Sequence, residues 1–288
     1  MDLNKYNIGI IGNGFVGGAI ANGFKQHNIK IYDVEAARRT HSLKKTVEDS
    51  DYIFICVPTP ADLLSNGEID LSILDDVFEK ISHLQHLENK IFIIKSTAIP
   101  GTTDKYSEQY PALNIVFNPE FLTERTANDD FLYPSRIVLG GATSSCNAVE
   151  KLYRILFPEV SFLKTTAVTA EFIKYFCNCF YAIKVSAFNE FNQIANTIGA
   201  DWEMALEGLL SSGWVNEMHT KVPGPDGHHG FGGKCFPKDL HAFTIFVEKN
   251  NVRPVILKAA WQKNLEVRKC HEWLKIRGAT SYKGEHDG

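Results

Sequence analysis

A glycine- and proline-rich segment surrounds one cysteine, and this combination indicates a reactive thiol rather than core packing. Residues 223–239 read PGPDGHHGFGGKCFPKD, so that Cys235 stands beside Lys234 and near Lys238. A helix is predicted to begin at about Asp239. Cationic neighbours and a nearby helix start favour the thiolate, which is the nucleophilic form of cysteine. Asp239, four residues beyond the thiol, could reach back toward it or toward a water molecule.

A lysine and an asparagine share one face of a long predicted helix. The apolar pattern from Thr165 to a Gly199 stop predicts a helix of about 30 residues, long enough to link domains or join subunits. Lys174 and Asn178 are four residues apart and therefore lie on the same side of it. This polar pair is conspicuous on a helix rich in aromatic residues, although a solvated stripe would give the same pattern.

A glycine-rich turn near the N-terminus predicts a dinucleotide site. An apolar stretch leads into GNGFVG at 12–17, followed by a helical pattern, a second apolar stretch and an acid. Gly12 permits a tight turn, Gly14 lets the backbone approach a diphosphate, and Gly17 lets helix and strand pack closely. The diphosphate would then lie at the helix N-terminus. Asp33 would accept hydrogen bonds from a ribose diol and repel a 2′-phosphate, which favours NAD over NADP.

Further apolar runs extend this pattern into an α/β domain. The runs are apolar throughout rather than alternating, which is typical of parallel strands covered on both faces. They lie at 51–57, 90–97, 114–117 and 135–141, with a helix predicted over 71–87. Ligands bind at the carboxyl ends of such strands. The residues at those ends are Val57, Pro58, Thr59, Ser96 and Thr97, of which Thr97 could instead cap a helix.

The composition excludes several classes of protein. The 288 residues are 44% hydrophobic and 22% charged, and 30 basic against 34 acidic residues give a net charge of −4. These are the values of a globular protein, and a mildly acidic chain is poorly suited to nucleic-acid backbones. We expect no signal peptide and no membrane partner, since no apolar stretch is long enough to span a bilayer. Six cysteines without a CxxC pair argue against a metal cluster or disulfide scaffold and favour the cytoplasm.

The cysteine segment makes the chain similar to one enzyme family. Residues 230–239, GFGGKCFPKD, resemble the active-site loop of the UDP-glucose/GDP-mannose 6-dehydrogenase family. Other segments follow in the order of that family, and the resemblance covers nearly the whole chain. They are GNGFVG at 12–17, VPTP at 57–60, KST at 95–97, PGT at 100–102, NPEFL at 118–122, PSRI at 134–137, EFIKYFCN at 171–178 and FNE at 188–190.

The resemblance implies a four-electron oxidation. Members of the family oxidise the C6 alcohol of a nucleotide sugar to a carboxylate in two NAD-dependent steps, and we expect UDP-glucose to give UDP-glucuronate. Cys235 would add to the intermediate aldehyde as a thiohemiacetal, and a thioester would then release the acid to water. Lys174 and Asn178 would hold the developing oxyanion. The residues that would position or activate water, or contact the sugar, are Asp239, Thr97, Glu124 and Glu120.

The resemblance also implies which residues bind the two ligands, with no metal involved. NAD would contact Gly12, Gly14, Phe15, Val16, Gly17, Asp33, Val57, Pro58, Thr59, Ser96, Thr97 and Lys238. The nucleotide sugar would contact Phe121, Leu122, Lys174, Asn178, Lys221, Phe231 and Gly232.

The sequence departs from the family pattern in two places. Family members continue into a second Rossmann-like domain that binds the nucleotide, whereas here an amphipathic helix predicted from Val255 to about Lys275 leads into a polar tail. We therefore expect a short form that lacks the C-terminal domain. Before the cysteine, where the family often has an arginine that touches the substrate phosphates, Lys221 or His219 could replace it.

These patterns predict an α/β fold, with a doubly wound Rossmann sheet followed by a mainly helical domain. We expect an NAD domain at 1–142, a connecting segment at 143–163, and a helical dimerisation and catalytic domain at 164–288. A homodimer would form through the helix at 165–198, because its aromatic side chains present more apolar surface than a small domain can bury.

Two other interpretations of the function stay open. A β-hydroxyacid dehydrogenase resembles the chain in length, in architecture and in its Lys-Asn pair, but needs one hydride transfer and no thiol. An inactive binding module could also have kept the cofactor fold. The sequence decides neither the sugar nor the base of the substrate.

Overall fold

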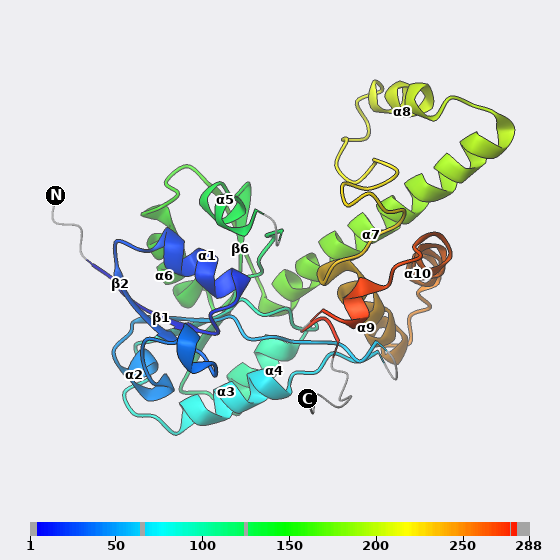
Figure 1. Cartoon of the computed structure of the whole chain (residues 1–288). Helices are drawn as coiled ribbons and strands as arrows, with labels where there is room; N and C mark the ends of the chain where they lie inside the picture. The colour runs from blue at the N-terminus through cyan, green and yellow to red at the C-terminus, as the bar shows by residue number, and fades with distance from the viewer. Residues whose placement is uncertain (1–4, 64–66, 124–125, 277, 281–288) are drawn as a thin grey trace. The chain divides into compact units, whose positions relative to one another are not determined.

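The structure is a computed structural model that describes residues 5–63, 67–123, 126–276 and 278–280 (Figure 1). The chain divides into two compact units. The first unit contains the chain up to Thr59 together with Leu71–Lys174, and the second contains Pro60–Asp70 together with the chain from Tyr175. The short segment 60–70 therefore belongs with residues that follow more than a hundred positions later in the sequence.

The first unit is built on a seven-stranded sheet in the order β2-β1-β3-β4-β5-β6-β7. The strands are β1 (Asn7–Ile11), β2 (Asn28–Tyr32), β3 (Tyr52–Ile55), β4 (Ile91–Ile94), β5 (Asn114–Phe117), β6 (Arg136–Gly141) and β7 (Ser161–Thr165). Neighbours pair in parallel except for β5 and β6, which run antiparallel. The strand order reverses at β1, so the switch point of a doubly wound sheet lies between β1 and β3. The predicted fold class is confirmed.

Helices cover both faces of this sheet. They are α1 (Phe15–Gly23), the 3₁₀ helix η1 (Ala36–Arg38), α2 (Leu43–Glu48), α3 (Ser72–Ser82), α4 (Thr102–Gln109), α5 (Ala127–Leu132) and α6 (Thr143–Arg154). Apolar residues of α2, α3 and α4 form one buried cluster with the sheet, and those of α1, α5 and α6 form the other (Figure 1). In β3, Ile53 and Ile55 join the first cluster while Phe54 joins the second. Burial on both faces explains why the strands are apolar throughout.

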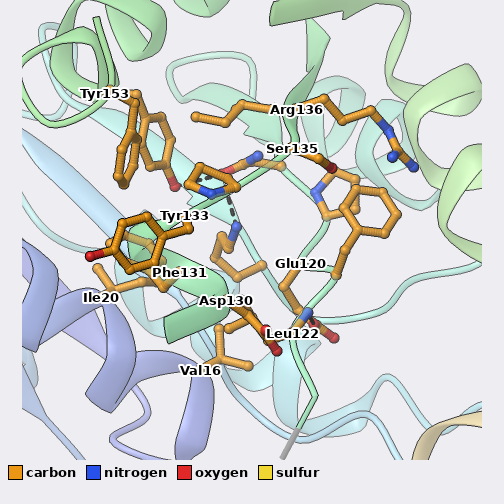
Figure 2. Close-up of a pocket in the computed structure, with 17 residues that line it drawn as sticks. Val16, Ile20, Glu120, Leu122, Asp130, Phe131, Tyr133, Ser135, Arg136 and Tyr153 are labelled. Carbon is orange, nitrogen blue, oxygen red and sulfur yellow. Dashed lines mark hydrogen bonds between the residues drawn. The ribbon is translucent and has the colours of Figure 1, made fainter. Parts of the chain in front are cut away.

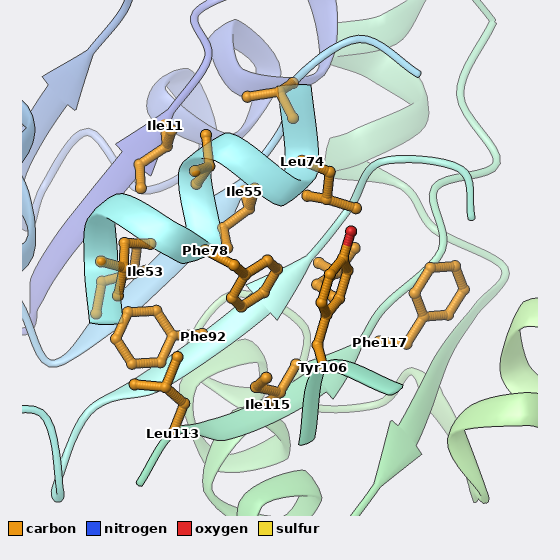
Figure 3. Close-up of a cluster of buried hydrophobic side chains, with 14 of the residues drawn as sticks. Ile11, Ile53, Ile55, Leu74, Phe78, Phe92, Tyr106, Leu113, Ile115 and Phe117 are labelled. Atoms are coloured by element: carbon orange, nitrogen blue, oxygen red, sulfur yellow. The ribbon is translucent and has the colours of Figure 1, made fainter. Parts of the chain in front are cut away.

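The first cluster is centred on two stacked aromatic rings. Phe78 of α3 and Tyr106 of α4 have ring centroids 4.5 Å apart and are fully buried. Figure 3 shows them beside the strand residues Phe92 and Ile115. The Tyr106 hydroxyl donates a 2.8 Å hydrogen bond to Asp75 at the edge of this cluster. The ring therefore fills the core while its polar atom finds a partner.

Residues 143–163, which we expected to connect two domains, instead belong to the sheet unit. They form α6 and the beginning of β7, which pairs in parallel with β6. β7 is an edge strand, and most of its side chains are exposed. It therefore has no continuous apolar run from which a strand could be predicted. The compact unit extends to Lys174, beyond the expected boundary at 142.

The second unit is helical in the part of the chain that the structure describes. Its elements are the C-terminal part of α7 (Ala167–Ile198), α8 (Trp202–Leu210), α9 (Cys235–Lys249), α10 (Val255–Val267) and the 3₁₀ helix η2 (Glu272–Leu274). The long predicted helix is confirmed as α7, which has 32 residues and runs from the first unit into the second. None of the described helices combines the length and apolarity that crossing a membrane requires.

Three helix boundaries differ from the prediction by four residues or more. The helix predicted over 71–87 is α3, which already ends at Ser82. α9 begins at Cys235 itself, not at about Asp239, and Pro237 is accommodated because the first helical turn needs no backbone donor there. α10 ends at Val267, well before Lys275, because Arg268 adopts an extended backbone and turns the chain back.

Candidate active site

The glycine-rich turn is shaped by three different requirements. Gly12 has a φ of +93°, and a Cβ there would lie 2.6 Å from the carbonyl oxygen of Cys56 at the end of β3. A Cβ at Gly17 would lie 2.0 Å from the carbonyl oxygen of Gly12. Both glycines therefore allow backbone to pack closely. A Cβ at Gly14 would meet no described atom within 4 Å, so Gly14 leaves open space at the start of α1.

The acid that follows β2 is held in a fixed position. Asp33 accepts a 2.7 Å hydrogen bond from the backbone N–H of Asn13, in the glycine turn, and a 2.9 Å bond from that of Glu35. Because Gly14 is the N-cap, no side chain of the described residues caps α1. An uncapped helix start suits a diphosphate, and the ordered carboxylate suits a ribose diol. Phe15 and Val16 form the first turn of this helix. These residues fit a bound NAD.

The predicted contacts at the strand ends serve different purposes. Ser96 is buried and donates a 2.7 Å hydrogen bond to the carbonyl oxygen of Val57, which ties the ends of β4 and β3 together. Thr59 is buried, whereas Pro58 is exposed and Thr97 is half-buried. Thr97 caps no helix, since the N-cap of α4 is Gly101. Pro58 and Thr97 are therefore the more accessible of the five.

A buried ion pair joins two predicted catalytic residues of the first unit. The Lys174 ammonium donates a 2.8 Å hydrogen bond to Oε1 of Glu120 and a 2.6 Å bond to the backbone carbonyl of the same residue. The other carboxylate oxygen of Glu120 accepts a 2.7 Å bond from the N–H of Leu122. The ammonium also lies 5.6 Å from the centroid of the Phe121 ring. Glu120 thus positions Lys174, and both are fixed to the loop that follows β5.

A second buried lysine lies at the end of β4. Lys95 donates a 2.9 Å hydrogen bond to Oδ1 of Asn118, which also accepts one of 2.7 Å from the Tyr153 hydroxyl. Burial lowers the pKa of Lys95 to about 8. Burial also raises the pKa of the neighbouring Cys56 thiol to about 12, so this cysteine is not activated as a nucleophile.

Lys95, Asn118 and Glu120 line a cavity of about 220 Å³ in the first unit. Val16, Ile20 and Phe131 form one wall, and Ser135 and Arg136 form the wall opposite (Figure 2). Lys95 and the loop after β5, including Glu120, Phe121 and Leu122, complete the lining. The Arg136 guanidinium is stacked 4.6 Å from the centroid of the Phe121 ring. The cavity therefore brings the predicted substrate residues Phe121 and Leu122 together with the predicted cofactor residue Val16.

The cysteine stands at the start of a helix whose first turns carry a buried polar cluster. Cys235 is the first residue of α9 and is half-buried, at the positive end of the helix dipole. One turn later, Asp239 is 1% exposed. Its carboxylate accepts 2.5 Å hydrogen bonds from the Asn178 amide and from the Lys238 ammonium. The structure thus brings Asn178, Lys238 and Asp239 into direct contact in the second unit.

The loop before the cysteine is held by two asparagines that are not among the predicted site residues. Asn189 of α7 accepts a 3.0 Å hydrogen bond from the N–H of Gly230. Asn264 of α10 accepts one of 2.7 Å from the N–H of Phe231 and donates one of 3.0 Å to its carbonyl. The Phe231 side chain is 3% exposed and packs inside the unit, and its contact with the substrate stays a prediction. Lys221 is exposed and stays a predicted phosphate contact.

One buried carboxylate was also missed by sequence reasoning. Glu171 of α7 is fully buried and accepts hydrogen bonds from the N–H groups of Gly101 and Thr103, at 2.6 and 2.7 Å. It therefore caps α4, and burial raises its pKa to about 7. The signal that could have identified it is the presence of an acidic residue within an apolar helical stretch. Glu124, predicted to act on water, lies outside the described residues. Among those described, no group of His, Cys, Asp or Glu side chains is arranged to hold a metal ion.

Family models match both units of the chain. Residues 34–157 match the NAD binding domain of the UDP-glucose/GDP-mannose dehydrogenase family, and residues 168–266 match its central domain. The chain belongs to this family. Together with the open glycine turn, the match identifies NAD as the cofactor.

Relatives from this family cover most of the chain. The UDP-glucose 6-dehydrogenase of Rickettsia prowazekii is 33% identical over 90% of this chain and 66% of its own length. The GDP-mannose 6-dehydrogenase of Pseudomonas aeruginosa is 30% identical over 78% of the chain and 53% of its own length. The chain thus spans about two thirds or less of the length of these relatives.

Solved structures agree with the family and the fold. A UDP-glucose dehydrogenase from Pyrobaculum islandicum has a TM-score of 0.80 at 26% identity and covers 92% of this chain and 69% of its own. A 3-hydroxyisobutyrate dehydrogenase from Mycobacterium tuberculosis has a TM-score of 0.72 at 16% identity, with 91% and 93% covered. At that identity the second likeness shows a shared fold alone.

Proposed function

We propose that the protein oxidises the C6 alcohol of UDP-glucose to the carboxylate of UDP-glucuronate through a thioester on Cys235. The observation that carries the proposal is the position of Cys235, at the first residue of α9 and one turn before the buried Asp239. A single hydride transfer to or from a hydroxyacid needs no such thiol. The name of the 33% identical relative supports UDP-glucose as the sugar nucleotide.

The residues have complementary roles in this proposal. NAD, when bound, supplies the hydride acceptor for both oxidation steps. The Cys235 sulfur forms a bond to the aldehyde carbon, and the Lys174 ammonium and the Asn178 amide stabilise the negative charge that develops on the oxygen. Asp239 accepts a proton from the water that opens the thioester. Glu120 holds Lys174 in place, since the two form a buried pair.

We further propose that the protein is a cytoplasmic homodimer joined through α7. This helix leaves large apolar side chains exposed, including Phe180 at 52%, Phe191 at 63% and Ile198 at 72%. Contiguous exposed apolar surface marks interaction sites. Light scattering should give the mass of two chains, and Phe180→Ser combined with Phe191→Ser should give one. None of the six cysteines, all of which lie in the described residues, forms a disulfide, which suits a reducing compartment.

The experiment is a product analysis of the purified protein with NAD and either UDP-glucose or GDP-mannose. Mass spectrometry should detect the uronic acid from UDP-glucose. Cys235→Ser should form no acid, whereas the matched control Cys270→Ser, which alters an exposed free cysteine, should behave like the wild type. Acid formation by Cys235→Ser at the wild-type rate would refute the thioester route. Acid formed from GDP-mannose but not from UDP-glucose would show that GDP-mannose is the substrate.

A further inference from the structure

The loop that carries Cys235 is fastened by two charged residues that follow α10. Oε1 of Glu272 accepts a 3.0 Å hydrogen bond from the N–H of Gly233, two residues before the cysteine. The same oxygen accepts a 2.5 Å bond from Nη2 of Arg268, and the Arg268 Nε donates one of 3.3 Å to the other carboxylate oxygen. Glu272 therefore holds the loop backbone while Arg268 holds Glu272.

The same arginine reaches the beginning of the loop. Arg268 Nη2 donates a 2.8 Å hydrogen bond to Oδ2 of Asp226, whose other oxygen accepts a 3.1 Å bond from the N–H of His228. The Arg268 side chain is only 2% exposed. A buried guanidinium with two carboxylate partners is rigid, because its donors are fixed in one plane. Both ends of the loop are thereby tied to one point.

The loop sequence leaves room for this arrangement. A Cβ at Gly232 would lie 2.0 Å from Glu272 Oε1 and 2.3 Å from Arg268 Nη2. Gly233 has a φ of +71°, a conformation that glycine adopts without strain. The two glycines before Lys234 therefore let the backbone lie directly against the ion pair.

The charges of the pair are stabilised in the folded protein. Burial opposes ionisation of Glu272, but the hydrogen bonds from Arg268 and Gly233 outweigh it and lower the pKa of this carboxyl. Both residues follow the part of the chain that matches the family's central domain, which ends at residue 266.

We infer that Glu272 is a positioning residue for the Cys235 thiol, which it keeps at the start of α9 by holding the N–H of Gly233. The inference rests on the proposed function, in which Cys235 is the nucleophile. Without the Glu272 carboxylate the loop would lose its link to Arg268 and move relative to α9. Displacement of a reacting group by about 1 Å can lower a rate about 100-fold.

The test uses Glu272→Ala, Glu272→Gln and the matched control Glu266→Gln in the full chain. Glu266 pairs with Lys263 on α10 and has an exposed side chain, so its charge can be removed without touching the loop. The first readout is the pH profile of iodoacetamide alkylation at Cys235, followed by mass spectrometry of its peptide. The second is kcat for NADH formation from the nucleotide sugar, and thermal melting reports folding.

We expect Glu272→Ala to lower kcat about 10- to 100-fold. We also expect its alkylation profile to move to higher pH, because the thiolate leaves the positive end of the helix. Glu272→Gln should recover only part of both, because its amide oxygen can still accept from Gly233 but has no charge to pair with Arg268. Glu266→Gln should match the wild type. A Glu272→Ala protein with wild-type alkylation and kcat would overturn the inference.

Two other outcomes are also decisive. If the wild type oxidises no nucleotide sugar, the proposed function fails, and the alkylation profile alone decides whether Glu272 positions the thiol. If Glu272→Ala does not fold, Glu272→Gln decides: an alkylation profile between wild type and ordinary cysteine supports the inference, and a wild-type profile overturns it.

Discussion

The Lys174 ammonium and the Glu120 carboxylate form an ion pair 2.8 Å apart, with side chains that are 4% and 7% exposed. Such a pair is costly to remove from water and still more costly to break, since one charge is then left without compensation. The carbonyl oxygen of Glu120 also accepts a 2.6 Å bond from Lys174. Two bonds to one residue fix the direction of the ammonium, as a group that must meet a developing negative charge requires.

Breaking this pair should separate stability from activity. Lys174→Met leaves the Glu120 carboxylate buried and unpaired, and should lower the free energy of unfolding by about 3–5 kcal/mol. Adding Glu120→Gln removes that charge, so the double variant should recover much of the stability. Both proteins should lose kcat by about 100- to 1,000-fold, because the oxyanion donor is gone. Urea denaturation and NADH formation measure the two effects, and a double variant as unstable as Lys174→Met would contradict the account.

Two glycines of the nucleotide turn should respond differently to alanine. Gly14→Ala adds a methyl group where no described atom lies within 4 Å, so the protein should fold but bind NAD at least about tenfold more weakly. Gly17→Ala places its methyl group 2.0 Å from the Gly12 carbonyl and should lower the free energy of unfolding by about 1–3 kcal/mol. Calorimetric titration with NAD and thermal melting distinguish the two, and unchanged NAD binding by Gly14→Ala would argue against the site.

The buried Lys95 should make stability depend on pH in the alkaline range. Its pKa is about 8 in the folded protein, because of burial, against an ordinary 10.5 in the unfolded chain. Between these values the unfolded chain binds more protons, so the lysine's contribution to stability rises with pH. The free energy of unfolding of the wild type should therefore rise relative to Lys95→Met by up to about 3 kcal/mol from pH 8 to 10.5. A pH-independent difference between the two proteins would show that Lys95 titrates normally.

Strong local patterns made much of the fold predictable. The strands β1, β3, β4 and β5 are buried on both faces, so each could be predicted from a continuous apolar run. The length of α7 could be predicted from its helical periodicity between a capping residue and Gly199. The glycine turn could be predicted because its three glycines stand at fixed spacing between a predicted strand and a predicted helix. Edge strand β7 lacked such a signal because most of its side chains are exposed and polar residues interrupt its apolar ones.

Contacts between residues distant in sequence were not predictable. The Glu171 cap on α4 joins positions about 70 residues apart, and the bond from Gly233 to Glu272 joins positions 39 apart. No periodicity records such pairings, which depend on how helices pack. The predicted start of α9 at about Asp239 is four residues too late, since the helix begins at Cys235 and tolerates Pro237 in its first turn.

The number of NADH molecules formed per nucleotide sugar consumed tests the central claim most directly. The wild-type protein is incubated with limiting UDP-glucose and excess NAD, and absorbance is followed to completion. The thiohemiacetal of Cys235 with the aldehyde undergoes the second oxidation, which gives the thioester, so we predict two NADH per sugar for the wild type. Cys235→Ser should form at most the one NADH of the first oxidation. One NADH per sugar with the wild type, or turnover of a simple hydroxyacid instead, would contradict the account.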